Sequence, residues 1–181
     1  AAFISYVLAI VSKEFAITAV ALLVPLYIYI QRPSLKRSLA ALAVSVGLAL
    51  IGGFVLYIRY AGVVGNLFDE NSRAFAQQLE QQTPGIGQHL FALSIQNQAS
   101  LFFHYGALWL LPYVGWMSID LRPTFPTNLW SWHTLGLVAY IATVIAGMWA
   151  VIKRQDAWGL LGLSVLTPAL LFMTEFGTIW L

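Results

Sequence analysis

The feature that most constrains this chain is its long apolar runs, and Ser38–Ile58 is the clearest of them. This segment has no charged side chain. At about 20 residues it is long enough for a helix to cross the ~30 Å hydrocarbon core of a bilayer. The composition agrees, because 60% of the 181 residues are hydrophobic, only 9% are charged, and the mean hydropathy is +0.78. A soluble domain carries about 25% charged residues. We therefore predict an integral membrane protein of the all-α class.

The apolar runs predict a polytopic transmembrane helical bundle that forms one domain over residues 1–181. The expected membrane helices cover approximately residues 1–11, 15–30, 38–58, 134–152 and 159–178. The chain opens without Met and stops directly after an apolar stretch, so we expect an internal fragment of a larger membrane protein. It contains no Cys, which excludes disulfides, thiolate metal sites and cysteine nucleophiles.

The distribution of Lys and Arg predicts the orientation in the membrane. Loop 31–37 carries three of these residues and loop 153–156 carries two, so the positive-inside rule places both loops in the cytoplasm. The long region 60–132 holds only Arg73 and Arg122, and we expect it to be external. The active face would then be external, which in a bacterial inner membrane means periplasmic.

Two helical segments are expected within this external region. Residues 71–82 read as an amphipathic helix with Phe75 and Leu79 on its apolar face, ended by Thr83-Pro84-Gly85. Residues 98–116 are apolar but contain His and Pro. If they crossed the membrane, loop 153–156 would fall outside, against the positive-inside rule. We therefore predict that they lie in the interface or form a re-entrant helix.

Lys13 and Glu14 interrupt a stretch of thirty residues, Ala1–Ile30, that is otherwise uncharged. A charge at the bilayer centre costs about 2.5–3.5 kcal/mol even on insertion scales. Such a pair is retained near an interface, beside a watery cavity or for a function. The alternative to a functional role is a structural one. In that case the pair lies at the membrane interface and fixes the depth of the helix, with the Lys13 side chain snorkelling toward water.

Several elements occur in a defined order around these charges. Val11-Ser12-Lys13-Glu14 opens a helix that soon reaches Pro25. Further along come Gln96 or Gln98, then His104-Tyr105-Gly106-Ala107-Leu108-Trp109-Leu110-Leu111-Pro112, and then Trp116-Met117-Ser118-Ile119-Asp120 before Pro123. Over about residues 8–126 this pattern resembles the GT-C superfamily of membrane glycosyltransferases. The resemblance is to the branch related to protein O-mannosyltransferases and to TPR-bearing transmembrane O-mannosyltransferases.

The resemblance implies transfer of a sugar from a polyprenyl-phosphate carrier to a protein or glycan acceptor. The family's catalytic carboxylate lies in a first external loop that has no counterpart in this chain. The base is therefore expected outside the fragment, with Asp120 and Glu14 as candidates within it, and the fragment alone should be inactive. An Arg- and Tyr-containing element expected after the last helix is also absent.

Five residues are candidates for contact with the substrate or the lipid phosphate. Lys13 and Arg122 could bind phosphate, Glu14 and Asp120 could bind the acceptor or the sugar, and His104 could meet the substrate. Asp120 could instead make its own turn bonds, and His104 could bond a backbone carbonyl. The absence of His-x-x-x-His and Glu-x-x-His spacings argues against a zinc site, while a divalent metal bound by a carboxylate is left open.

Two other functions fit the same sequence. A secondary transporter or channel fragment would use Lys13-Glu14 as an ion pair on a permeation path, and would require residues 98–116 to span the membrane. A lipid-linked polysaccharide ligase or polymerase would be expected to have an external loop richer in Arg and His. Nucleic-acid binding is not expected, since the net charge is only +2 and no basic run exceeds Lys36-Arg37.

Overall fold

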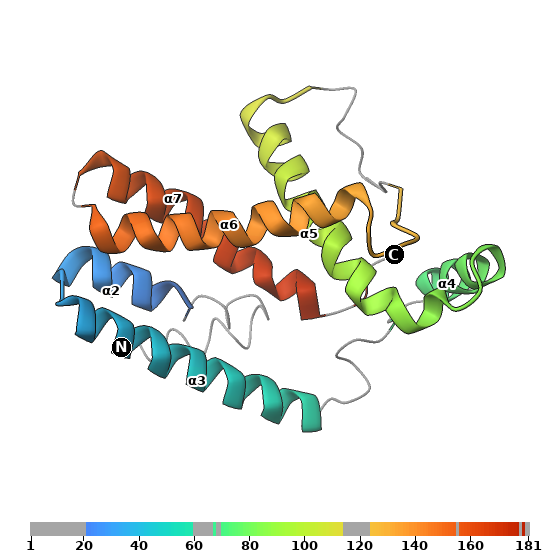
Figure 1. Ribbon diagram of the computed structural model, residues 1–181, viewed down its shortest axis with the longest axis horizontal. Helices are drawn as coiled ribbons and strands as arrows, with labels where there is room; N and C mark the ends of the chain where they lie inside the picture. Colours follow the sequence, from blue (N-terminus) through green and yellow to red (C-terminus); the bar gives the residue numbers. More distant parts are fainter. Residues whose placement is uncertain are drawn as a thin grey trace. The chain divides into compact units, whose positions relative to one another are not determined.

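The computed structural model describes residues 21–59, 67, 70–113, 124–154, 156–177 and 179. All regular structure in these residues is helical (Figure 1). The elements are α2 (Leu23–Gln31), α3 (Leu35–Arg59), α4 (Glu70–Gln82), η2 (Ile86–His89), α5 (Leu90–Leu110), α6 (Trp132–Lys153), α7 (Ala157–Phe172) and η4 (Met173–Gly177). The predicted all-α class is thus confirmed for the described part of the chain.

Two helices in the described part are long and apolar enough to cross a membrane: Trp132–Lys153, and Ala157–Gly177, in which η4 continues α7. They correspond to the predicted spans 134–152 and 159–178. Only 17% of the most apolar window of the first and 33% of that of the second is buried. A core helix of a soluble protein would be mostly buried. The low burial therefore favours helices that face lipid or another apolar partner.

The other predicted membrane helices are described to different extents. An unbroken helix, α3, covers the whole of the predicted span 38–58. Of the predicted helix 15–30, the described part forms α2, with Pro25 in its first turn, where a missing N–H removes no bond within α2. The predicted helix 1–11 lies outside the described residues.

The chain divides into two units, and the first comprises residues 1–59 and 142–174. In its described part, α2 packs against α3 and α7. Its core is formed by Ile28 of α2, Val151 of α6, and Leu166 and Leu170 of α7, each at most 9% exposed. The α7 pair is separated by four residues, which places both side chains on one face of the helix.

Close backbone contact joins α6 to α7 in this unit. A Cβ atom added at Gly162 would lie 2.6 Å from the Cβ of Ala150 and 3.0 Å from the carbonyl oxygen of Gly147. A Cβ added at Gly159 would meet the carbonyl oxygen of Arg154. Small residues allow helix backbones to approach in this way, as is common in membrane bundles. The turn between the helices is closed by Asp156, whose Oδ1 accepts a hydrogen bond from the Trp158 N–H at 3.1 Å.

Arg32 connects the end of α2 to the end of α6. It adopts a left-handed backbone conformation with φ 50°, and its N–H donates to the Ile28 carbonyl at 3.1 Å. Its Nη1 donates to the carbonyls of Val151 at 3.2 Å and of Arg154 at 2.7 Å. Val151 lies in the last turn of α6 and Arg154 directly follows this helix, at the end where a cation is also favoured by the helix dipole.

The second unit comprises residues 60–141 and 175–181. The buried side chains of Leu79, Ile86, Leu90, Leu93 and Ile179 form its core, with Phe125 packed against them. The predicted amphipathic helix 71–82 is confirmed as α4. Leu79 is only 6% exposed, and Phe75 makes an edge-to-face contact with Phe125 at 6.5 Å between ring centroids.

The segment that follows α4 is held by the carboxylate of Glu80. It accepts hydrogen bonds from the N–H groups of Gly85 at 2.7 Å and Gly87 at 2.8 Å. Gly85 has φ 88°, a conformation that suits Gly, and so allows the chain to turn from α4 into η2. These bonds favour the ionised carboxylate and lower the pKa of Glu80 from its ordinary value of 4.5.

We expect a Glu80→Gln variant to exchange the amide hydrogens of Gly85 and Gly87 several-fold faster than the wild type at pH 7. The ionised carboxylate stabilises this turn only while the pKa in the folded state is the lower one. Its contribution is therefore present above pH 4.5 and is lost as the pH falls through the lowered pKa. The difference between the two proteins, corrected for intrinsic exchange, should then disappear in acid. Gln81→Ala is the control and should leave both amides protected.

One predicted boundary was wrong. The aromatic segment was expected to begin at Gln98, yet α5 begins at Leu90 and continues without a break to Leu110. Because it is one continuous helix through residue 110, the described part shows no re-entrant break. Although α5 has 21 residues, it is not among the helices apolar enough to cross a membrane.

Candidate functional site

His104 is the one of the five predicted site residues that the structure describes. It lies in the second half of α5 and is partly buried. The other four lie outside the described residues: Lys13, Glu14, Asp120 and Arg122. The described part therefore does not test whether these charges share one cleft, and that arrangement stays a prediction.

The first half of α5 carries an unusual buried polar cluster. Ser94, Gln96, Asn97 and Gln98 are 1%, 7%, 5% and 6% exposed, respectively. Four polar residues within five positions cover more than one face of a helix, because successive residues are 100° apart. Burying an amide without a hydrogen bond costs about 1–3 kcal/mol on the protein scale. A cluster of this kind needs partners on several sides.

Some of these partners come from the segment that precedes α6. The Gln96 Nε2 donates to the Leu129 carbonyl at 3.1 Å, and the Thr134 Oγ1 donates to the same carbonyl at 2.7 Å. The Ser100 Oγ donates within α5 to the Gln96 carbonyl at 3.2 Å and also approaches the His133 carbonyl at 3.4 Å. These bonds attach the segment before α6 to the middle of α5.

The approach of α6 to α5 depends on Gly136. A Cβ atom at this position would lie 3.0 Å from the Cα of Ser100 and would also meet its hydroxyl. Phe102 of α5 stacks edge-to-face on Tyr140 of α6 at 5.2 Å between ring centroids, and Tyr140 contacts Phe176 in the same way at 5.0 Å. The polar cluster thus has an aromatic layer beside it.

Two amide oxygens of the cluster accept no hydrogen bond from any described residue. These are the Oε1 of Gln96 and the Oδ1 of Asn97, both buried. Buried polar side chains are nearly always satisfied by protein or ordered water, so each oxygen calls for a donor.

The second half of α5 exposes large aromatic side chains. Tyr105 is 46% exposed, Trp109 83% and Tyr113, just beyond the helix, 62%. Amphipathic aromatic residues concentrate at the membrane interface, and they also stack on sugar rings. Both roles suit a helix that lies at the external membrane surface, as predicted for this segment.

Among the described residues, no group of three or more His, Asp or Glu side chains could hold a metal ion. Glu70 of the acidic pair Asp69-Glu70 lies in the first turn of α4, where a carboxylate interacts favourably with the helix dipole.

Comparison of this chain with models of protein families, with curated proteins and with solved structures found no match.

The buried amides of Gln96, Asn97 and Gln98 are not among the site residues that the sequence predicts. Gln96 and Gln98 enter the sequence pattern only through the resemblance, and Asn97 has no predicted role. The signal was present, since three consecutive amides inside an apolar stretch indicate internal partners or function. What the sequence could not supply was the position of the Leu129 carbonyl.

Proposed function

We propose that this chain belongs to a multi-pass glycosyltransferase of the GT-C type that uses a polyprenyl-phosphate-linked sugar. The acceptor would be a protein or a glycan, and the reaction would take place at the external face, periplasmic in a bacterial inner membrane. The proposal rests on the sequence resemblance and on the arrangement of charges in an otherwise apolar chain. Two helices that could cross a membrane support the membrane setting.

The observation that carries the choice among functions is the character of α5. A transporter or channel would require this segment to cross the membrane. In contrast, α5 buries the amides of Gln96, Asn97 and Gln98, and it is not among the described helices that are long and apolar enough to cross one. If α5 stays at the external face of the membrane and does not cross it, loops 31–37 and 153–156 lie on the same side. The positive-inside rule places that side in the cytoplasm. Lys13 and Asp120 then lie on the same external side.

In the proposed reaction an acceptor oxygen attacks the anomeric carbon of the sugar. The bond from that carbon to the carrier's phosphate oxygen breaks, and the acceptor proton passes to a carboxylate base. Lys13 and Arg122 would stabilise the departing phosphate electrostatically. Glu14 and Asp120 would shape the cleft.

The test uses the full-length protein reconstituted in liposomes with radiolabelled polyprenyl-phosphate mannose, chosen because the resemblance is to O-mannosyltransferases. We expect label to move to a protein or glycan fraction and free polyprenyl phosphate to inhibit the transfer. Labelled hexoses on the same carrier would identify another sugar. If no carrier-linked sugar is consumed while the liposomes gain an ion or solute flux, the transporter function replaces this proposal.

A further inference from the structure

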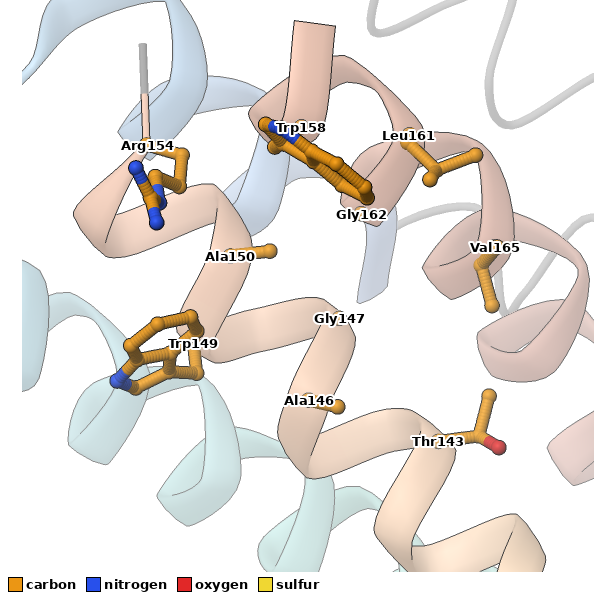
Figure 2. A pocket seen from close by; sticks show the side chains of 10 residues that line it. All are labelled: Thr143, Ala146, Gly147, Trp149, Ala150, Arg154, Trp158, Leu161, Gly162 and Val165. Atoms are coloured by element: carbon orange, nitrogen blue, oxygen red, sulfur yellow. The ribbon is translucent and has the colours of Figure 1, made fainter. Parts of the chain in front are cut away.

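A groove runs along the surface of α6 and α7 in the first unit (Figure 2). It has a volume of about 520 Å³, and the residues that line it are almost entirely apolar. Its floor consists of small residues, among them Ala146, Gly147 and Gly162, while the indoles of Trp149 and Trp158 flank it. Arg154 stands at the end that leads into the α6–α7 turn.

The helical repeat explains why the groove is separate from the core of this unit. Val151, Leu166 and Leu170 point into the core with α2. The groove residues occupy neighbouring stripes, such as Trp158, Leu161 and Val165 on α7, with a spacing of three and four. These three side chains are 63%, 52% and 39% exposed, so the groove is open to its surroundings in the described part of the chain.

The length of the groove matches one leaflet of a bilayer. Thr143 and Arg154 mark its two ends along α6, eleven positions apart, which corresponds to about 16 Å of helix. Half of a ~30 Å hydrocarbon core is about 15 Å. The Trp residues lie nearer the turn, which is the interfacial level where Trp accumulates in membrane proteins.

The turn end of the groove is positively charged. Loops 31–37 and 153–156 together contain Arg32, Lys36, Arg37, Lys153 and Arg154 against one acidic residue, Asp156. Arg32 lies beside the α6–α7 turn, because its Nη1 donates to the Val151 and Arg154 carbonyls. Asp156 is already engaged with the Trp158 N–H. An anionic headgroup complements this charge, whereas a neutral apolar helix does not.

We propose that this groove binds an anionic glycerophospholipid of the cytoplasmic leaflet. One acyl chain lies on the floor between Trp149 and Trp158, and the phosphate contacts Arg154. Anionic lipids are concentrated in that leaflet and attract nearby Lys and Arg side chains. The site is distinct from the proposed external cleft, and the inference does not depend on the glycosyltransferase activity.

The test measures quenching of Trp fluorescence by brominated lipids, using the full-length protein in vesicles. One vesicle series contains phosphatidylcholine with increasing dibrominated phosphatidylglycerol, and the other contains increasing dibrominated phosphatidylcholine. Subtracting a Trp149→Phe/Trp158→Phe protein isolates the signal of the groove. We expect half-maximal quenching at an about fivefold lower mole fraction of the anionic lipid, which is the effect of one cationic residue near the surface.

Two matched pairs of variants decide the assignment. Arg154→Gln should abolish the preference for the anionic lipid, whereas Lys153→Gln, which removes the neighbouring charge outside the groove, should retain most of it. Ala146→Phe fills the floor and should reduce quenching by both lipids, while Ile145→Phe on another face of α6 should not. Equal quenching by both lipids in the wild type would overturn the proposal. A cysteine at position 146 that cross-links to another protein segment would show a helix in the groove and would also overturn it.

Discussion

Replacing Lys13 with Gln should lower kcat for sugar transfer by about 100-fold or more in the full-length protein. The carrier phosphate gains negative charge as its bond to the sugar breaks, and a cation that contacts it stabilises the transition state more than the ground state. Removal of one such preorganised group typically costs 10²–10³ in kcat. Lys13→Arg should restore part of the rate, because it retains the charge but changes its position.

The matched control is Lys36→Gln, which removes the same charge from the predicted cytoplasmic loop. It should leave the rate within about twofold, since exposed charges across a membrane from the substrate are screened. The assay follows label transfer from polyprenyl-phosphate mannose, with kcat and KM determined separately. An unchanged kcat in Lys13→Gln, with the protein correctly inserted, would remove Lys13 from the reaction and leave it as an interfacial anchor.

The second large effect concerns stability. Gly162→Leu should destabilise the contact between α6 and α7 by about 1–3 kcal/mol or more, the usual cost of forcing extra volume into a packed interface. The Cβ alone would lie 2.6 Å from Ala150 Cβ and 3.0 Å from the backbone oxygen of Gly147, so the helices must separate. Thermal unfolding in detergent, followed by near-ultraviolet circular dichroism, measures the loss.

Gly47→Leu provides the control within the same unit. Gly47 lies inside α3, and a Cβ there meets no atom within 4 Å among the described residues. Leu is favoured over Gly in a helix by about 0.5–1 kcal/mol. This variant should therefore be as stable as the wild type or more stable. Equal destabilisation by both substitutions would show that close packing of α6 on α7 does not hold this unit together.

Much of the helical layout follows from simple patterns. The apolar run 38–58 forms most of α3, which begins three residues earlier at Leu35 and ends at Arg59, and loop 153–156 separates α6 from α7 as expected. The end of α4 was predicted because Pro84 and Gly85 cannot continue a helix. At the ends of α3, α4 and α6, a local signal such as a charge, a Pro or a Gly marks the boundary.

The start of α5 could not be read in the same way. Gln96, Asn97 and Gln98 look like a loop when only hydropathy is considered, since exposed amides often end a helix. In the folded unit they are buried, and Gln96 is paired with a carbonyl 33 positions away. Such tertiary partners are invisible to a local pattern, and they override it.

The groove and the candidate site also depend on tertiary neighbours that a local sequence pattern does not reveal. The small residues around Gly147 were visible in the sequence, yet spacing alone does not identify Gly162 as the partner or reveal that Arg154 closes the end. For the predicted external cleft, Lys13, Glu14, Asp120 and Arg122 lie outside the described residues. Their convergence therefore rests on the positive-inside rule and on the nature of α5.

The measurement that tests this convergence most directly is side-specific cysteine labelling, which the absence of native Cys makes simple. Single cysteines are placed at positions 13, 36, 120 and 153 of the full-length protein and labelled with a membrane-impermeant maleimide before or after opening of the cells. The account predicts labelling of 13 and 120 from outside, and of 36 and 153 only from the cytoplasm. Labelling of position 120 from the cytoplasm would mean that α5 crosses the membrane, and would contradict the shared external cleft.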